Sequence, residues 1–158
     1  IYRGRENLNQ WKSSHALETK DRSLSDAIKN ADVFLGLSAK GALTKDMVKK
    51  EQLLSMKEDA IIINTARGGI INEQYLYEVM QSGHLSGAAI DVFDFEPYYG
   101  KLREIKRCIL TAHMGSMSVD CRARMEIEAT EEAVRFLTNH PLEGVVPEEE
   151  YAVQREGL

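Results

Sequence analysis

The stretch 60–69, AIIINTARGG, constrains the fold of this chain more than any other. Its first part, 60–63, is a short apolar run rich in β-branched residues, with a polar segment before it and a turn after it. Such a run predicts a buried strand of a parallel sheet. The second part, 64–69, leaves the strand at its carboxyl end, which is where open α/β sheets bind their ligands.

Three residues of that turn have the chemistry of a binding loop. Gly68 and Gly69 allow the backbone to approach a ligand closely or to adopt a positive φ. Arg67 offers a planar guanidinium that can bind a carboxylate through two hydrogen bonds. The alternative is an ordinary strand-to-helix turn whose arginine pairs with a nearby acid.

Strands and helices alternate along the rest of the chain. Strands are expected at 33–37, 60–63, 87–92 and 107–110. Helices are expected at 24–29 with Ser23 as the cap, at 44–57, at 72–80 with Asn72 as the cap and a glycine end at Gly83, and at 119–138. This alternation predicts an α/β fold with a doubly wound parallel sheet and right-handed crossovers, a partial Rossmann-like domain. The apolar residues of 44–57 do not share one helical face, so we expect that helix to be kinked or loosely packed.

The bulk properties narrow the class of protein. The chain has 158 residues and a net charge of −5, which gives no reason to expect nucleic acid or an anionic membrane as a partner. No apolar run approaches the roughly 20 residues of a membrane span, and the amino end lacks a signal-peptide pattern. Cys108 and Cys121 do not have the spacing of a metal site. We therefore expect a reduced, cytoplasmic protein without a structural metal.

Residues suited to binding a ligand follow each of the four expected strands. Ser38 follows the first of them, and the segments 64–69, 91–97 and 111–116 follow the others. Because the carboxyl ends of parallel strands meet at one edge of a sheet, we expect an active site there.

Three side chains at that edge form a chemically coherent set. Arg67 can hold a carboxylate, His113 can exchange a proton near neutral pH, and Glu96 can hydrogen-bond one nitrogen of the imidazole and orient the ring. Reversible oxidation of a 2-hydroxy acid requires this set, together with a cofactor that accepts a hydride. Taken singly, a histidine after a strand is more often a surface or capping residue than an acid–base group, and Glu96 before Pro97 is more often solvated at a turn.

Several ordered motifs carry a family resemblance. They are Asn-Thr-Ala-Arg-Gly-Gly at 64–69, Gly-Ala-Ala-Ile-Asp-Val-Phe at 87–93, Glu96-Pro97, and Leu-Thr-Ala-His at 110–113. On these motifs the region from about 50 to 144 resembles the carboxyl-terminal half of the cofactor domain of the D-isomer-specific 2-hydroxyacid dehydrogenases, the family of phosphoglycerate dehydrogenase. Ala112 stands where that family usually has proline.

The resemblance implies a role for each matched residue. Arg67 would bind the substrate carboxylate, His113 would be the acid–base residue and Glu96 its partner. Asp91 would meet the nicotinamide side of NAD. Thr65, Ala66, Gly115 and Ser116 would line the cofactor pocket. Dimers of this family form largely through the cofactor domain, so the resemblance also implies a homodimer.

The first part of the chain resembles a second family. The segments 1–9, 31–38 and 41–44 are similar to the NAD(P) domain of bacterial malic enzymes, in which Ser38 would pass near the cofactor ribose. We therefore expect residues 1–158 to form a single partial dinucleotide-binding domain with a change of family near 41–50.

One expected motif is missing from the sequence. None of the 11 glycines forms G-x-G-x-x-G, the turn that brings a dinucleotide pyrophosphate to a helix amino end. We therefore expect this chain alone to bind NAD weakly and to turn over little substrate, and NADP is not excluded. The alternatives are a malic-enzyme-like oxidative decarboxylase and a non-catalytic recombinant Rossmann-like module.

Overall fold

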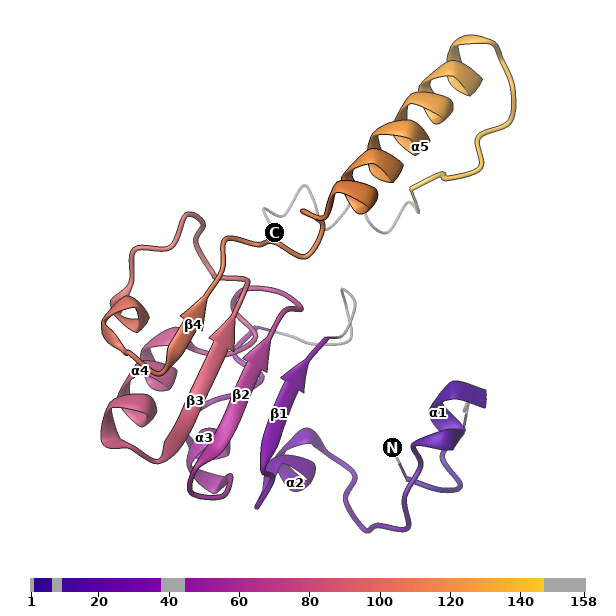
Figure 1. The fold of residues 1–158 in the computed structure, drawn as a ribbon. Helices are drawn as coiled ribbons and strands as arrows, with labels where there is room; N and C mark the ends of the chain where they lie inside the picture. The colour runs from indigo at the N-terminus through magenta and orange to yellow at the C-terminus, as the bar shows by residue number, and fades with distance from the viewer. Residues whose placement is uncertain (1, 7–9, 38–44, 147–158) are drawn as a thin grey trace. The chain divides into compact units, whose positions relative to one another are not determined.

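A four-stranded parallel sheet forms the centre of the first of two compact units, 1–113 and 114–158. The computed structural model describes residues 2–6, 10–37 and 45–146. The strands are β1 (Val33–Gly36), β2 (Ala60–Asn64), β3 (Leu85–Ile90) and β4 (Cys108–Leu110), and their order in the sheet is their order in the chain (Figure 1). The predicted parallel α/β fold is confirmed.

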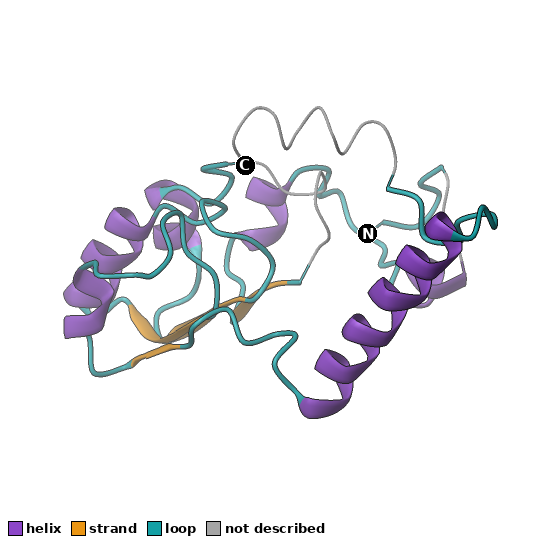
Figure 2. Cartoon of the chain, turned by 90° about the horizontal axis from the view of Figure 1, so that it is seen from above, coloured by secondary structure: helices purple, strands orange, loops and turns teal. Residues whose placement is uncertain are grey.

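The helices that connect these strands lie on one face of the sheet (Figure 2). The helical segments of the first unit are α1 (Gln10–Ser14), α2 (Leu24–Ile28), α3 (Lys50–Ser55), α4 (Glu73–Ser82) and the 3₁₀ turn η1 (Lys101–Glu104). When strand order follows chain order, right-handed crossovers all fall on the same side. The alternation along β2 agrees, because Ile62 is fully buried whereas Ile61 is 40% exposed. Val33 and Leu35 of β1 are likewise about half exposed.

Local capping explains where two of the helices begin and end. Ser23 and Asp26 form a reciprocal capping box at the start of α2. The Asn72 side chain accepts a hydrogen bond from Tyr75 N (3.1 Å) at the start of α4, which ends at Gly83 with a φ of 85°. These predicted caps are confirmed.

The segment 45–49 differs from the prediction. A helix is expected over 44–57, but α3 begins only at Lys50, and residue 44 lies outside the described residues. Val48 is extended and forms a parallel bridge with Ile71, with Val48 N donating to Ile70 O (3.0 Å). Val48 and Leu53 are both fully buried, but from two different kinds of backbone. The irregular apolar pattern therefore marks a change from extended chain to helix, not a kinked helix.

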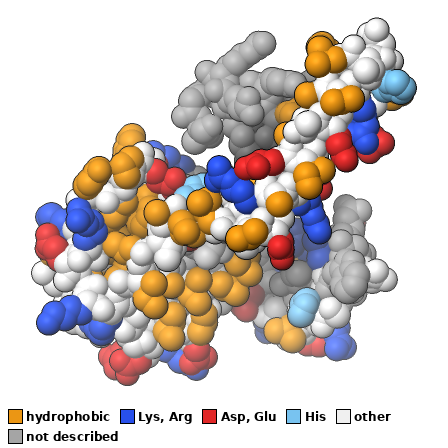
Figure 3. Space-filling view, turned by 45° about the horizontal axis from the view of Figure 1, so that its top comes forward, with side chains coloured by type: hydrophobic (Ala, Val, Ile, Leu, Met, Phe, Trp, Pro, Cys, Tyr) orange, Lys and Arg blue, Asp and Glu red, His pale blue; other side chains and the backbone are white. Residues whose placement is uncertain are grey.

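The second unit is described by itself. Its helix α5 (Val119–Leu137) begins at the cap Ser118, whose side chain accepts from Cys121 N (3.2 Å). Hydrophobic and charged side chains alternate over its surface (Figure 3), and Val119, Ile127, Val134 and Leu137 are more than half exposed. Among the described residues, no helix combines the length and apolar character that crossing a membrane requires.

Candidate active site

Backbone hydrogen bonds join the carboxyl ends of all four strands. Thr65 N donates to Gly36 O (3.0 Å), Asp91 N donates to Asn64 O (3.0 Å), and His113 N donates to Asp91 O (2.8 Å). The carboxyl end of β1 and the loops that follow β2, β3 and β4 are therefore neighbours at one edge of the sheet. This is the edge at which the sequence predicts the ligand site.

Asn64 shapes the loop that carries Arg67. This side chain is 2% exposed, its Nδ2 donates to Arg67 O (3.0 Å), and its Oδ1 accepts from Ala66 N (3.2 Å). The amide thus satisfies two backbone groups of the turn and holds it against the end of β2. The Arg67 side chain is exposed, and its Nη1 donates to Ala66 O (2.8 Å). Sequence reasoning missed the role of Asn64, although a polar residue at the end of an apolar run is a usable signal.

His113 and Glu96 form the predicted contact. His113 Nδ1 lies 3.0 Å from Glu96 Oε2, and the other carboxylate oxygen accepts from Phe93 N (3.0 Å). Partial burial alone raises the pKa of Glu96, but the hydrogen bond from Phe93 N and the interaction with His113 together lower it below its ordinary value. An ionised carboxylate can only accept, so Nδ1 carries the hydrogen and Nε2 is left as the acceptor.

The backbone of His113 adopts an unusual conformation. Its φ is 54°, in the left-handed region that few residues other than glycine enter. The hydrogen bond from His113 N to Asp91 O and the contact of its ring with Glu96 hold this conformation. Strained backbone of this kind concentrates at functional sites, where it aims a side chain.

Asp91 presents a carboxylate at the same edge. The residue is only 7% exposed, and its Oδ1 accepts from Thr111 Oγ1 (2.5 Å). A buried carboxylate beside a hydroxyl suits the amide group of a nicotinamide, so these residues fit one end of NAD. The orienting role of Thr111 is a second feature that sequence reasoning missed, because nothing in the local pattern pairs residues 20 apart.

The other predicted cofactor residues are placed differently. Thr65 is exposed beside the end of β1, whereas Ala66 is 4% exposed and packs in the core, so only its backbone is available to a ligand. Ser38 lies outside the described residues. Gly115 and Ser116 belong to the second unit, in a turn closed by Met117 N donating to Met114 O (3.0 Å). The roles of these five residues stay predictions.

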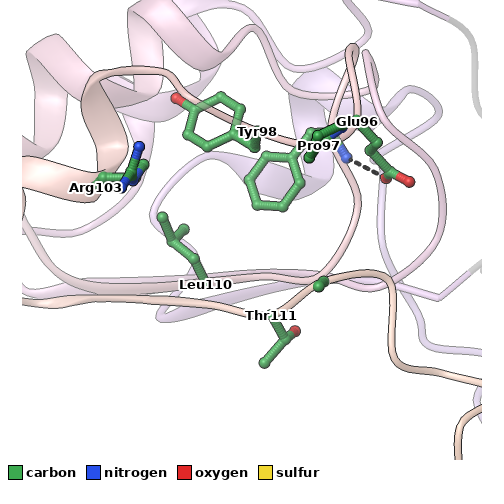
Figure 4. A pocket seen from close by; sticks show the side chains of 8 residues that line it. Glu96, Pro97, Tyr98, Arg103, Leu110 and Thr111 are labelled. Atoms are coloured by element: carbon green, nitrogen blue, oxygen red, sulfur yellow. Dashed lines mark hydrogen bonds between the residues drawn. The ribbon is translucent and has the colours of Figure 1, made fainter.

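A cavity of about 560 Å³ adjoins the His113–Glu96 pair. It is lined by Phe93, Glu96, Pro97, Tyr98, Arg103, Leu110, Thr111 and Ala112. Figure 4 shows Arg103 toward one end of this cavity and Glu96 toward the other. Its apolar wall includes the stacked rings of Phe93 and Tyr98, whose centroids lie 4.3 Å apart.

Two other chemistries were considered for the described part of the chain. Burial raises the pKa of the Cys108 thiol to about 11, so Cys108 serves packing and not nucleophilic attack. Within residues 2–6, 10–37 and 45–146, no group of three or more His, Cys, Asp or Glu side chains could hold a metal ion.

The fold and this set of side chains define a class of protein. A parallel sheet with a histidine–carboxylate pair, a buried aspartate and an arginine–glycine loop at its carboxyl edge is part of a dinucleotide-binding dehydrogenase domain. Comparison with known families agrees. The family model "D-isomer specific 2-hydroxyacid dehydrogenase, NAD binding domain" matches residues 2–115. The chain belongs to this family, whose cofactor is NAD.

Individual relatives support the same assignment. D-3-phosphoglycerate dehydrogenase of Bacillus subtilis is 32% identical over 122 residues, which is 77% of this chain and 23% of that protein. Glyoxylate reductase 1 of Saccharomyces cerevisiae is 34% identical over 106 residues, 66% of this chain and 30% of that protein. The holo form of Rhodotorula graminis D-mandelate dehydrogenase superposes with a TM-score of 0.76 at 27% identity, covering 89% of this chain and 41% of that one.

Two consequences follow for the sequence predictions. The chain spans well under half the length of each of these relatives, so their whole activities do not transfer directly. The family match also includes residues 2–45, the part that resembles malic enzymes. The change of family near 41–50 stays a prediction.

Proposed function

We propose that this chain forms the cofactor side of an active site that interconverts a 2-hydroxy acid and the corresponding 2-oxo acid. The observation that carries the proposal is the 3.0 Å contact between His113 Nδ1 and Glu96 Oε2, at the sheet edge that also bears Arg67. This contact supplies a proton acceptor with a fixed tautomer, which is the group that oxidation of an alcohol needs.

His113 moves the proton in this proposal. In the direction of oxidation, its Nε2 takes the proton of the substrate hydroxyl, and in reduction it returns that proton to the carbonyl oxygen. Glu96 stabilises the imidazolium that forms and keeps the ring oriented. Bound NAD supplies the hydride acceptor.

Arg67 and Asp91 position the two reactants. Arg67 binds the substrate carboxylate through its guanidinium, a contact that a simple alcohol without a carboxylate could not make. Asp91, oriented by Thr111, holds the nicotinamide end of the cofactor. Both loops are joined to the strand ends by backbone hydrogen bonds, which supports their common position at this edge.

Turnover assays with matched variants test this proposal. The substrates are 3-phosphoglycerate, glyoxylate, D-lactate and malate, each with NAD or NADH and in parallel with NADP or NADPH. Because the glycine-rich phosphate loop is missing, we expect only slow turnover of a 2-hydroxy or 2-oxo acid by this chain. We also expect an increase in KM in Arg67→Ala and a loss of about 100-fold or more in kcat in His113→Ala. Lys106→Ala, an exposed cation outside the site, serves as the control.

The outcomes separate the competing functions. Activity that His113→Ala leaves intact would contradict the proposal. Release of CO₂ from malate would instead favour an oxidative decarboxylase, and a folded chain without turnover of any of these acids would favour a non-catalytic module. The family resemblance further supports a homodimer, which light scattering of the purified chain tests directly.

A further inference from the structure

We propose that Gly68 is a positioning residue, which sets the spacing between the Arg67 loop and the Glu96–His113 pair. The inference rests on the proposed function for those three side chains, but its geometric content can be tested without turnover. It starts from a close approach between two loops that are far apart in the sequence.

Gly68 lies directly against the backbone of Phe93. A Cβ built on Gly68 would stand 1.8 Å from Phe93 O, 2.1 Å from Phe93 C and 2.7 Å from Asp94 N. Side chains never approach backbone atoms this closely, so any other residue must push the two loops apart. The φ of Gly68 is not among the positive values, so the requirement concerns space and not conformational freedom.

Phe93 connects this contact to the acid–base pair. Its carbonyl faces Gly68, while its N–H donates to Glu96 Oε1 (3.0 Å), and Glu96 Oε2 in turn contacts His113 Nδ1 (3.0 Å). Phe93 therefore contacts the Arg67 loop through its carbonyl group and binds the Glu96 carboxylate through its N–H. A displacement of Phe93 must reach His113 through Glu96.

Hydrogen bonds and an ion pair of the neighbouring residues restrain both the Phe93 loop and the Arg67 loop. Asp94 N donates to Glu73 Oε1 (2.8 Å), and the Asp94 carboxylate pairs with Lys45 Nζ (3.3 Å). On the other loop, Gly69 O accepts from Asp46 N (2.7 Å). These contacts restrain both loops. A methyl group at position 68 is therefore accommodated by an increase in the distance between the Arg67 loop and Glu96. Displacements of about 1 Å in such sites cost on the order of 100-fold in rate.

The first experiment compares two glycine-to-alanine variants of this chain. In Gly68→Ala we expect the ring ¹⁵N resonances of His113, assigned with His113→Gln, to shift toward the mixed tautomers of a solvated imidazole. The matched control is Gly87→Ala, because a Cβ there meets only Arg107 O at an ordinary 3.5 Å. Equal His113 spectra in folded Gly68→Ala and Gly87→Ala would overturn the proposal.

A second experiment decides the question should Gly68→Ala fail to fold. Glu96→Ala releases Phe93 N, so the amide resonances of Gly68 and Gly69 are expected to move and their hydrogen exchange to quicken. His113→Ala leaves the Phe93–Glu96 hydrogen bond in place and is expected to change those amides much less. Glycine amides that respond no more to Glu96→Ala than to His113→Ala would overturn the proposal. Absence of turnover would count against the proposed function alone, since neither readout measures activity.

Discussion

At the scale of single residues, the site depends on side chains that bind the backbone. Asn64 satisfies two peptide groups of the Arg67 loop, Glu96 accepts from Phe93 N, and Thr111 holds Asp91. Each of these contacts fixes a loop at the end of a strand. The geometry of the candidate site therefore depends on these few hydrogen bonds.

Replacing Asn64 tests that dependence. In Asn64→Leu, Ala66 N and Arg67 O both lose their partner in a region that is largely buried. Each unsatisfied group costs about 1–3 kcal/mol, so we expect the free energy of unfolding to fall by at least about 1 kcal/mol in urea titrations. Gln74→Leu, on the exposed side of α4, is the control. A change no larger than that of the control would contradict the role given to Asn64.

The lowered pKa of Glu96 leads to a prediction about how the stability of the folded protein changes with pH. Its pKa is lowered in the folded protein, so its carboxylate contributes stability that is present above the unfolded value of about 4.3 and is lost as the pH falls through the folded value. Glu96→Gln removes this titration. The melting temperatures of the two proteins should therefore differ most at neutral pH and converge below about pH 4. A difference that stays constant with pH would show that the carboxylate charge is not involved.

At the scale of elements, one arginine joins a helix, a strand and a turn. Arg107 donates to Met80 O (3.1 Å) in the last turn of α4 and to Leu85 O (2.9 Å) at the start of β3. A cation at the carboxyl end of a helix also interacts favourably with the helix dipole. The crossover from α4 to β3 is thus held by a residue that immediately precedes β4.

The loss of this guanidinium should be costly. Arg107→Met keeps much of the apolar stem and leaves Met80 O and Leu85 O without this donor. Hydrogen bonds from charged groups contribute about 1.5–3 kcal/mol, so we expect a loss of that order in chemical unfolding. Arg103→Met removes an exposed guanidinium from the neighbouring turn and should change stability by less than about 0.5 kcal/mol.

The second unit has its own carboxylate contact. Glu132 of α5 accepts from Gly144 N (3.2 Å) and Glu143 N (3.1 Å) and pairs with Arg135 (2.6 Å). These hydrogen bonds, led by that from Gly144, lower the pKa of Glu132. The contact should therefore persist above the unfolded pKa and open as the pH falls through the folded one. We expect the protection factors of the Glu143 and Gly144 amides, taken relative to the intrinsic exchange rate at each pH, to fall in acid, and to stay constant with pH in Glu132→Gln.

At the scale of the whole molecule, the sequence correctly predicts those features that depend only on residues close together in the chain. The strand 60–63, the caps Ser23 and Asn72 and the turn at Gly83 depend on neighbours in the chain, and the structure confirms them. The segment 45–49 was predicted wrongly because its extended form depends on pairing with Ile71, a tertiary contact. The sequence does not predict the roles of Asn64 and Thr111 for the same reason, because their hydrogen-bond partners depend on the assembled edge of the sheet.

The distribution of buried residues leads to a prediction about folding. Every member of the buried hydrophobic cluster lies between Ile28 and Leu102, within the first unit. The first unit therefore has a buried apolar core of its own. We expect a chain that ends at Met117 to unfold cooperatively, with a melting temperature within about 4 °C of the full chain, the shift produced by 1 kcal/mol in a domain of this size. Differential scanning calorimetry of both chains measures this. A larger fall would contradict the expectation that the core of the first unit is sufficient for its stability.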